Sequence, residues 1–351
     1  MVNLRLRRAG LPIAVSAVVA AVAVTGTIFA MGTAGAETVT ATTVTAAADP
    51  AAQRAAVAAA RKAAPKLSAS GKRALAAAAD EQDYGDITGD GKADLAAIDS
   101  GGAMWVYPGK RYIYPGSGTR SKNIFGTRQL VGTGWGKFNS LVRHGSFNGD
   151  DRQDILTRDA KGNLAFYAGT GDPAAMFKKG TPAGTGWGNF VSITGAGDLN
   201  GDGRDDLLGQ KTNGDLALYT GTGTIAKPFS TRGTIIGTGW KGDLLTALGD
   251  VTGDGRSEFA FRNTKGLVTY YDSKSGANPI GKGTVVITDG DVGKFLKNIV
   301  GPGDLTSDAG YTPTPDTVWQ FKDGYLYVIA YDSDPDGDAE IGSGWGSFRL
   351  F

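Results

Sequence analysis

The chain has 351 residues, with 36 basic and 35 acidic side chains. The formal net charge of +1 argues against a nucleic-acid partner held by a strong electrostatic field. Cysteine is absent, which excludes disulfide bonds, and 55 glycines among 41% apolar residues favour a folded chain rich in tight turns.

The first 36 residues have the order of an export signal. Arg5, Arg7 and Arg8 precede an almost wholly apolar run, Leu11–Met31, and the small residues Ala34-Gly35-Ala36 follow it. We therefore predict a signal peptide that is cleaved after Ala36, and a secreted, extracellular protein with no membrane attachment after cleavage. An uncleaved anchor is the alternative, because the apolar run is about as long as a membrane-spanning helix.

Residues 37–80 are dominated by alanine. The segments Ala55–Ala64 and Lys72–Ala79 have the propensity to form short helices, but neither carries a face of large apolar side chains. We therefore expect this Ala-rich stretch to bury little and to act as a spacer or pro-segment before a folded body at residues 81–351.

From residue 85 onward a nine-residue acidic segment recurs. Four copies align without a gap and start 60, 52 and 52 residues apart, at Asp86, Ser146, Asp198 and Asp250. A fifth copy starts at Asp304 and takes an insertion of four residues before Asp316. Thirteen residues after its ninth position, each of the first four copies has a tyrosine: Tyr107, Tyr167, Tyr219 and Tyr271. The same count from Asp316 reaches Ile329, so the register survives the insertion.

A second motif, Gly-Thr-Gly-Trp or a variant of it, precedes each acidic segment from the second onward and recurs at the end of the chain. Its aromatic residues are expected to pack between repeats, with a role as ligand platforms as the alternative. The recurring tyrosines are expected to belong to the core, with stacking on sugars as the alternative. The runs between the motifs, such as Leu164–Tyr167 and Leu216–Tyr219, have the composition of short strands. About four strands in each repeat of roughly 52 residues suit one blade of a β-propeller.

The ends of the chain predict a closed ring. In the third repeat seven residues separate Phe190 from Asp198, whereas only three residues follow Phe348 at the C-terminus. About four residues before Asp86 supply the remainder. We therefore predict an all-β fold, a five-bladed β-propeller in which the C-terminal strand joins the first blade and removes an exposed sheet edge.

The acidic segments predict calcium sites. Positions 1, 3, 5 and 9 offer side-chain oxygens and position 7 offers its backbone carbonyl, which together match the six to eight hard oxygen ligands of Ca²⁺. Glycine at position 6 permits the sharp turn that such a loop needs. The alternative is a plain turn with solvated charges. The candidate ligands are Asp86, Thr88, Asp90, Lys92, Asp94, Asn148, Asp150, Asp154, Asp198, Asn200, Asp202, Arg204, Asp206, Asp250, Thr252, Asp254, Arg256 and Glu258.

The copies are unequal. The second has Ser146 at position 1 and Asp151 at the glycine position, so we expect weaker binding there. The fifth loop is doubtful because of its insertion. A further acidic run, Asp332–Glu340, matches the spacing but lies where the other repeats have no loop.

The repeated Asp-x-Asn/Thr-Gly-Asp-Gly-x-x-Asp pattern resembles the FG-GAP or VCBS repeats of bacterial secreted proteins and integrin α-subunits, over about residues 84 to 351. The resemblance implies a propeller with calcium in its blade loops. Five repeats depart from the seven blades of integrins, and the second and fifth loops depart from the motif. Such repeats occur alone and joined to hydrolases, so the resemblance does not decide the activity.

No catalytic constellation stands out. His144 is the only histidine, and no Gly-x-Ser-x-Gly elbow accompanies a serine. Asp289, Asp291, Asp334 and Asp338 lie outside the five repeated acidic segments, and their spacing suggests no glycosidase pair. We expect a monomeric binding module for carbohydrate or another extracellular partner. A secreted hydrolase and a purely structural or adhesive surface protein are the alternatives.

Overall fold

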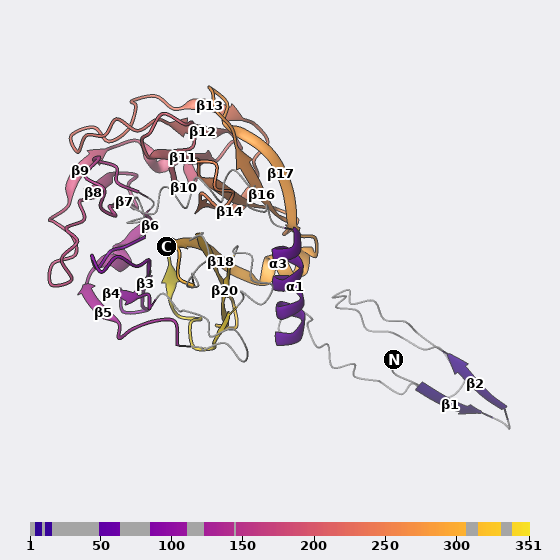
Figure 1. Cartoon of the computed structure of the whole chain (residues 1–351). Coiled ribbons are helices and arrows are strands. Elements are labelled where there is room, and N and C mark those ends of the chain that lie inside the picture. The colour runs from indigo at the N-terminus through magenta and orange to yellow at the C-terminus, as the bar shows by residue number, and fades with distance from the viewer. Residues whose placement is uncertain are drawn as a thin grey trace.

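A computed structural model of the chain describes residues 4–8, 11–15, 49–63, 85–110, 123–143, 145–306, 315–330 and 339–351. Five four-stranded antiparallel sheets form the body of the protein. The sheets are arranged as blades around a common centre, with the strands β6, β10, β14 and β18 innermost (Figure 1). The fold is therefore the five-bladed β-propeller that the repeats predict.

The blades are numbered in chain order, and their strands are given from the inner to the outer edge. Blade 1 contains β22 (Arg349–Leu350), β3 (Asp94–Ile98), β4 (Met104–Pro108) and β5 (Gln129–Gly132). Blade 2 contains β6 (Phe138–Val142), β7 (Ile155–Asp159), β8 (Leu164–Tyr167) and β9 (Thr181–Gly184). Blade 3 contains β10 (Phe190–Gly197), β11 (Asp206–Lys211), β12 (Leu216–Tyr219) and β13 (Thr234–Gly237).

Blade 4 contains β14 (Gly242–Gly249), β15 (Glu258–Asn263), β16 (Val268–Ser273) and β17 (Ile280–Ile287). Blade 5 contains β18 (Leu296–Gly303), β19 (Asp316–Phe321), β20 (Leu326–Ile329) and β21 (Ala339–Gly342). Outside the blades lie the paired strands β1 (Leu4–Arg8) and β2 (Leu11–Val15), the helices α1 (Pro50–Ala63) and α3 (Gly290–Phe295), and the 3₁₀ turns Trp135–Lys137 and Trp187–Asn189.

The C-terminal strand closes the ring. Arg349 pairs with Ile98 and Leu350 pairs with Ala97, so β22 supplies the inner strand that the first repeat lacks. The predicted closure is confirmed. The register of the fifth repeat is confirmed as well, because Thr317 pairs with Ile329 just as residues at the same position pair with the tyrosines of blades 1 to 4.

The recurring tryptophans join neighbouring blades. The Trp135 amide donates to the Gly102 carbonyl in blade 1, while its indole packs on Tyr167 of blade 2, with ring centroids 4.8 Å apart. Trp187, Trp240 and Trp345 repeat both contacts at the following junctions. The tyrosine rings are half-buried against these indoles. The prediction that these aromatic residues pack between repeats is confirmed.

A polar clamp crosses every blade junction. A long side chain, carried by the second strand in blades 2 to 5, donates to two backbone carbonyls at the start of the next blade. Arg158 donates to the carbonyls of Trp187 and Phe190, Gln210 to those of Trp240 and Gly242, and Arg262 to those of Gly293 and Leu296. Gln320 donates to the carbonyls of Trp345 and Phe348, and Arg349 to those of Trp135 and Phe138. In blade 1 the second strand has Ile98 at this position, and its partner across the sheet, Arg349, supplies the clamp.

Helix α1 packs on the rim of the propeller, beside β17 and α3 (Figure 1). Val57 and Ala60 are 3% and 2% exposed and belong to the core cluster of blades 4 and 5. Gln53 donates to the Asp323 carboxylate at 2.6 Å, and Arg54 pairs with Glu340 at 2.9 Å. The expectation that the Ala-rich stretch buries little is therefore wrong for residues 50–63. Small side chains such as alanine and valine let the helix approach the sheet closely, so they are enough to form a buried face.

Several sequence-based predictions fall outside the described residues. These concern most of the predicted signal peptide, with its cleavage site, together with Lys72–Ala79, His144, Asp308, Asp334 and Asp338. Within the described part of the chain, no helix is long and apolar enough to cross a membrane. The role of residues 37–80 as a spacer or pro-segment stays a prediction.

The clamp at the closing junction can be tested by Arg349→Ala. The substitution leaves the Trp135 and Phe138 carbonyls without this donor, so we expect the free energy of unfolding to fall by about 1–3 kcal/mol. Urea denaturation measures the change, and Arg232→Ala, which removes an exposed arginine, is the control. Equal stability of the two variants would contradict a role for the clamp.

Candidate metal loops

The acidic segments lie where each blade passes from its inner to its second strand. The second, third and fourth connect β6 to β7, β10 to β11 and β14 to β15, and the first leads into β3 of blade 1. Because the inner strands of all blades run in the same direction along the central axis of the ring, the connections that follow them lie on one face of the propeller. We call the segments loops 1 to 4, and number positions 1 to 9 within each.

The side chain at position 1 organises each loop. In loop 1 the Asp86 carboxylate accepts hydrogen bonds from the backbone amides of Gly89 at 2.6 Å and Gly91 at 2.7 Å. Asp198 accepts the equivalent pair in loop 3, and the Ser146 hydroxyl takes the same role in loop 2. Serine can therefore shape the loop, but it does not add a carboxylate to a metal site.

The side chain at position 9 ties the loop to its blade. Asp94 accepts from the amides of Ile87 and Thr88 at 2.9 and 2.8 Å, and from the amide of Gly109 beyond β4 at 3.1 Å. In the fifth repeat Asp316 accepts from the Leu305 amide at 2.8 Å in the same way. Asp316 thus makes the same kind of hydrogen bond as Asp94 despite the insertion in the fifth repeat, although nothing in the described residues completes a fifth metal loop.

Backbone geometry explains the glycines. Positions 4 and 6 have positive φ in all four loops, as at Gly201 (84°) and Gly203 (80°) in loop 3. Loop 2 places Asp151 at position 6 with φ of 61°, the one non-glycine residue with positive φ in the described chain. A side chain with a Cβ is strained in this left-handed region. Loop 2 therefore adopts the same backbone shape as the other loops at an energetic cost, while its weaker metal binding stays a prediction.

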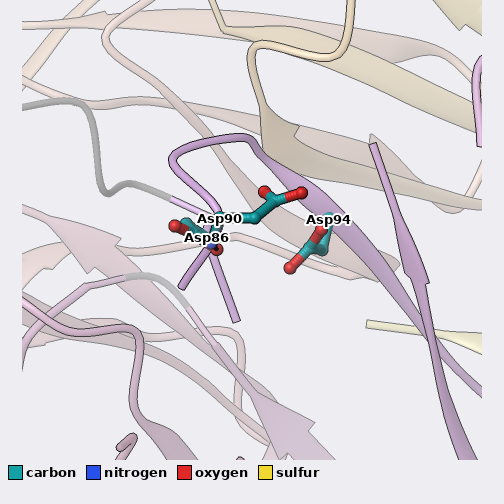
Figure 2. Close-up of side chains that lie close together, drawn as sticks. All are labelled: Asp86, Asp90 and Asp94. Atoms are coloured by element: carbon teal, nitrogen blue, oxygen red, sulfur yellow. Dashed lines mark hydrogen bonds between the residues drawn. The ribbon is translucent and has the colours of Figure 1, made fainter. Parts of the chain in front are cut away.

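Loops 1 and 4 gather three carboxylates each. One oxygen from each of Asp86, Asp90 and Asp94 lies within 4.8 Å of the others, and Figure 2 shows these side chains around one bend of the chain. The oxygens of Asp250, Asp254 and Glu258 meet the same limit. Lys92 and Arg256, at position 7, pair with the position 5 carboxylates at 3.3 and 2.5 Å.

Loop 3 differs from this arrangement. The Asn200 amide nitrogen donates to Asp202 at 3.3 Å and to Asp206 at 3.0 Å, so an amide, rather than a cation, bridges the two carboxylates. For Asn200 to act as an oxygen ligand, its amide has to turn over. In loop 2, Asn148 accepts from the Asp150 amide at 2.9 Å, and Asp154 bonds to the Gly169 amide.

Burial raises the pKa of the position 9 carboxyl in every loop. The pKa rises to about 6 at Asp94 and to about 7 at Asp154 and Asp206. The pKa of Glu258 rises well above its usual range. Desolvation is the largest cause in each case, and repulsion from other carboxylates of the same loop adds to it. A cation among these groups would remove both costs.

The residues fit calcium. Thr88 at position 3 is 4% exposed, and its buried hydroxyl, like the Asp154 Oδ2 atom, has no hydrogen-bond partner among the described residues. Buried oxygens without donors, next to clustered carboxylates, form the hard-oxygen set that Ca²⁺ takes. Loop 1 would hold the ion through Asp86, Thr88, Asp90, Asp94 and the Lys92 carbonyl, and loop 4 through Asp250, Thr252, Asp254, Glu258 and the Arg256 carbonyl. In loop 3 the Arg204 carbonyl takes the same place in sequence.

Sequence reasoning missed the contact between neighbouring loops. Asp205 at position 8 of loop 3 is directed to loop 2, where it bonds to the Ser146 amide and leaves no space for a side chain at Gly145. Burial raises its pKa to about 6. Gln153 of loop 2 likewise accepts from the Gly85 amide of blade 1 at 3.3 Å. The polar residue at position 8 of loops 2 and 3 was the feature of the sequence that could have indicated this contact.

The other acidic residues have structural roles where they are described. Asp289 caps α3 by accepting from the amides of Asp291 and Val292, and Asp291 pairs with Lys294 at 4.0 Å. Glu340, the last residue of the sixth acidic run, pairs with Arg54 of α1. The remaining carboxylates of that run lie outside the described residues.

A cavity of about 330 Å³ opens among the inner strands at the centre of the ring. Its lining includes Ser140, Ser192, Thr246 and Asn298 from four blades. Asp243 is the one carboxylate side chain among the described residues that line it, and it pairs with Arg262 at 2.7 Å.

Fold and loops together define a five-bladed propeller with acidic loops on one face. A sequence model of the FG-GAP-like repeat family matches residues 147–209, which run from loop 2 into β11. The chain thus carries an FG-GAP-like repeat in this region.

Similar solved structures include BBS1N in complex with ARL6DN, soaked with mercury, at 12% identity and a TM-score of 0.30, covering 68% of this chain and 64% of that one. The Dos1 propeller is similar at 9% identity and a TM-score of 0.32, covering 72% of this chain and 68% of that one. The chain thus spans slightly less than two thirds of the BBS1N chain. No curated protein sequence matches this chain.

The strain in loop 2 can be tested by Asp151→Gly. Glycine adopts a φ of 61° freely, so we expect the free energy of unfolding to rise by about 1 kcal/mol. Thermal or urea denaturation measures the gain. Asp151→Ala is the matched control, because it removes the same charge but keeps the strained Cβ. A gain of equal size in both variants would assign the effect to charge and contradict the strain.

Proposed function

We propose that this protein is a secreted, calcium-binding propeller that acts as a monomeric binding module for carbohydrate or another cell-surface partner. The observation that carries the calcium proposal is the arrangement of loops 1 and 4, each with three carboxylate oxygens within 4.8 Å of one another. The buried, unpartnered Thr88 hydroxyl and the raised pKa of Asp94 support it.

Secretion is proposed from the leader sequence, since residues 1–36 combine basic, apolar and small-residue segments in the order of a signal peptide. A cysteine-free extracellular chain has no disulfides to stabilise it, and calcium in repeated loops offers a substitute. Sequencing of the exported chain should give Glu37 as its first residue, whereas an intact leader would indicate a membrane anchor.

A binding role is favoured by the composition of the central cavity. A glycosidase needs two carboxyl groups flanking its substrate, free for acid and for base or nucleophile roles. Asp243, the single carboxylate side chain in the described lining, is already paired with Arg262. The polar hydroxyl and amide groups around it are suited to holding a ligand by hydrogen bonds.

Calcium binding is tested by melting residues 37–351 with calcium and with chelator. Each occupied loop stabilises the fold by about 1.4 kcal/mol when free calcium is about ten times its dissociation constant, so the melting temperature should rise by several degrees. Asp86→Asn and Asp250→Asn should each reduce the rise, while Asp215→Asn, outside the loops, should not. No shift together with no bound metal by elemental analysis contradicts the proposal.

The binding role is tested on a glycan array with the calcium-loaded protein. We expect retention of a subset of glycans without release of products. Turnover that is lost in His144→Ala would instead indicate a hydrolase. Absence of both binding and turnover would point to a structural or adhesive protein without a small ligand.

A further inference from the structure

The central cavity combines a suitable size with a polar wall. About 330 Å³ lies within the range of small-molecule sites in proteins and is enough for one sugar-sized ligand. The inner strands of all five blades line it, and Ser140, Ser192, Thr246 and Asn298 place hydroxyl and amide groups along different sides. Such groups recognise hydroxylated molecules through hydrogen bonds from several directions.

One of the residues that line this cavity is a buried arginine. Arg143 lines it, is 5% exposed, and donates to the Asp94 carbonyl at 2.9 Å and to the Pro302 carbonyl at 2.8 Å. An arginine guanidinium keeps its positive charge at neutral pH even when it is buried. Its counterparts in blades 3, 4 and 5 are Gly195, Ala247 and Gly301, so among blades 2 to 5 only blade 2 carries this charge.

The hydrogen bonds of this guanidinium go to backbone carbonyls, and no salt bridge of Arg143 is found among the described residues. The Asp94 carboxylate attracts it without forming an ion pair, and Asp94 does not line the cavity. Arg349, also in the lining, donates to carbonyls as well, and its buried Nε atom has no partner among the described residues. Asp243 is already neutralised by Arg262. The side chains around the cavity thus leave an excess of positive charge, and a buried cation is costly until an anion approaches it.

We propose that the central cavity binds an anionic saccharide unit, with a carboxylate or sulfate group near Arg143 and the sugar hydroxyls against the serine, threonine and asparagine side chains. Charge-assisted hydrogen bonds from a guanidinium to such a group are stronger than neutral ones and account for selectivity against uncharged sugars. The inference rests on the proposed binding function and assigns it a location and a ligand class.

The test titrates the calcium-saturated full chain with D-glucuronate, inorganic sulfate and D-glucose by calorimetry. We expect glucuronate to bind at least about tenfold more tightly than glucose. Sulfate binding as tight as that of glucuronate would keep the anion site but assign it to free inorganic anions. Equal affinity for glucose and glucuronate, or no saturable binding of either anion, overturns the proposal.

Substitution of Ser192 locates the site without disturbing Arg143, which joins three blades. Ser192→Asp adds a negative charge to the lining and should weaken glucuronate binding by at least about tenfold, while the neutral Ser192→Asn should keep it. Unchanged melting temperatures establish that both variants fold. If Ser192→Asp binds like the wild type, the cavity is not the site. Glycan-array binding that persists in that variant leaves the proposed function intact, whereas failure of the calcium shift contradicts that function independently.

Discussion

The propeller depends on a donor that crosses each blade junction. Four-stranded sheets satisfy their own backbone groups, but the segment that enters a blade has carbonyls that no strand partner reaches. Arg158, Gln210, Arg262, Gln320 and Arg349 supply those hydrogen bonds. At four of these five junctions a tryptophan also packs on the next blade's tyrosine, the exception being the junction between blades 4 and 5. Because unsatisfied buried carbonyls are costly, the clamp fixes how one blade sits on the next.

The acidic loops follow from the same geometry. With the blades fixed, the ninth position of every loop is buried beneath its own strand connection, and its carboxyl group loses hydration. The raised pKa values of Asp94, Asp154 and Asp206 are the direct result. The loops also contact one another across blades, because Asp205 and Gln153 hydrogen-bond to the loop of the preceding blade.

Repetition made most of the architecture predictable. Repeat spacing predicted the blade number, the Ile329 register and the closure by the C-terminal strand, because period-two strands and a fixed repeat leave few arrangements. The clamp was not predictable, because it alternates between arginine and glutamine and moves to Arg349 where blade 1 has Ile98. Docking of α1 was missed because Val57 and Ala60 form too small an apolar face to stand out. The amide bridge made by Asn200 depends on side-chain orientation, which a motif does not specify.

Ring closure also has a consequence for the timing of folding. The bond from Arg349 to Phe138 joins residues 211 positions apart, and β22 follows every other blade strand in the sequence, so a growing chain reaches it after them. Blade 1 has no inner strand until then, so a growing chain can pair its later blades but not complete the ring. Long-range contacts of this kind are slow to form. Closure of the ring is therefore expected to be the slow step of folding, and it follows the formation of the individual blades.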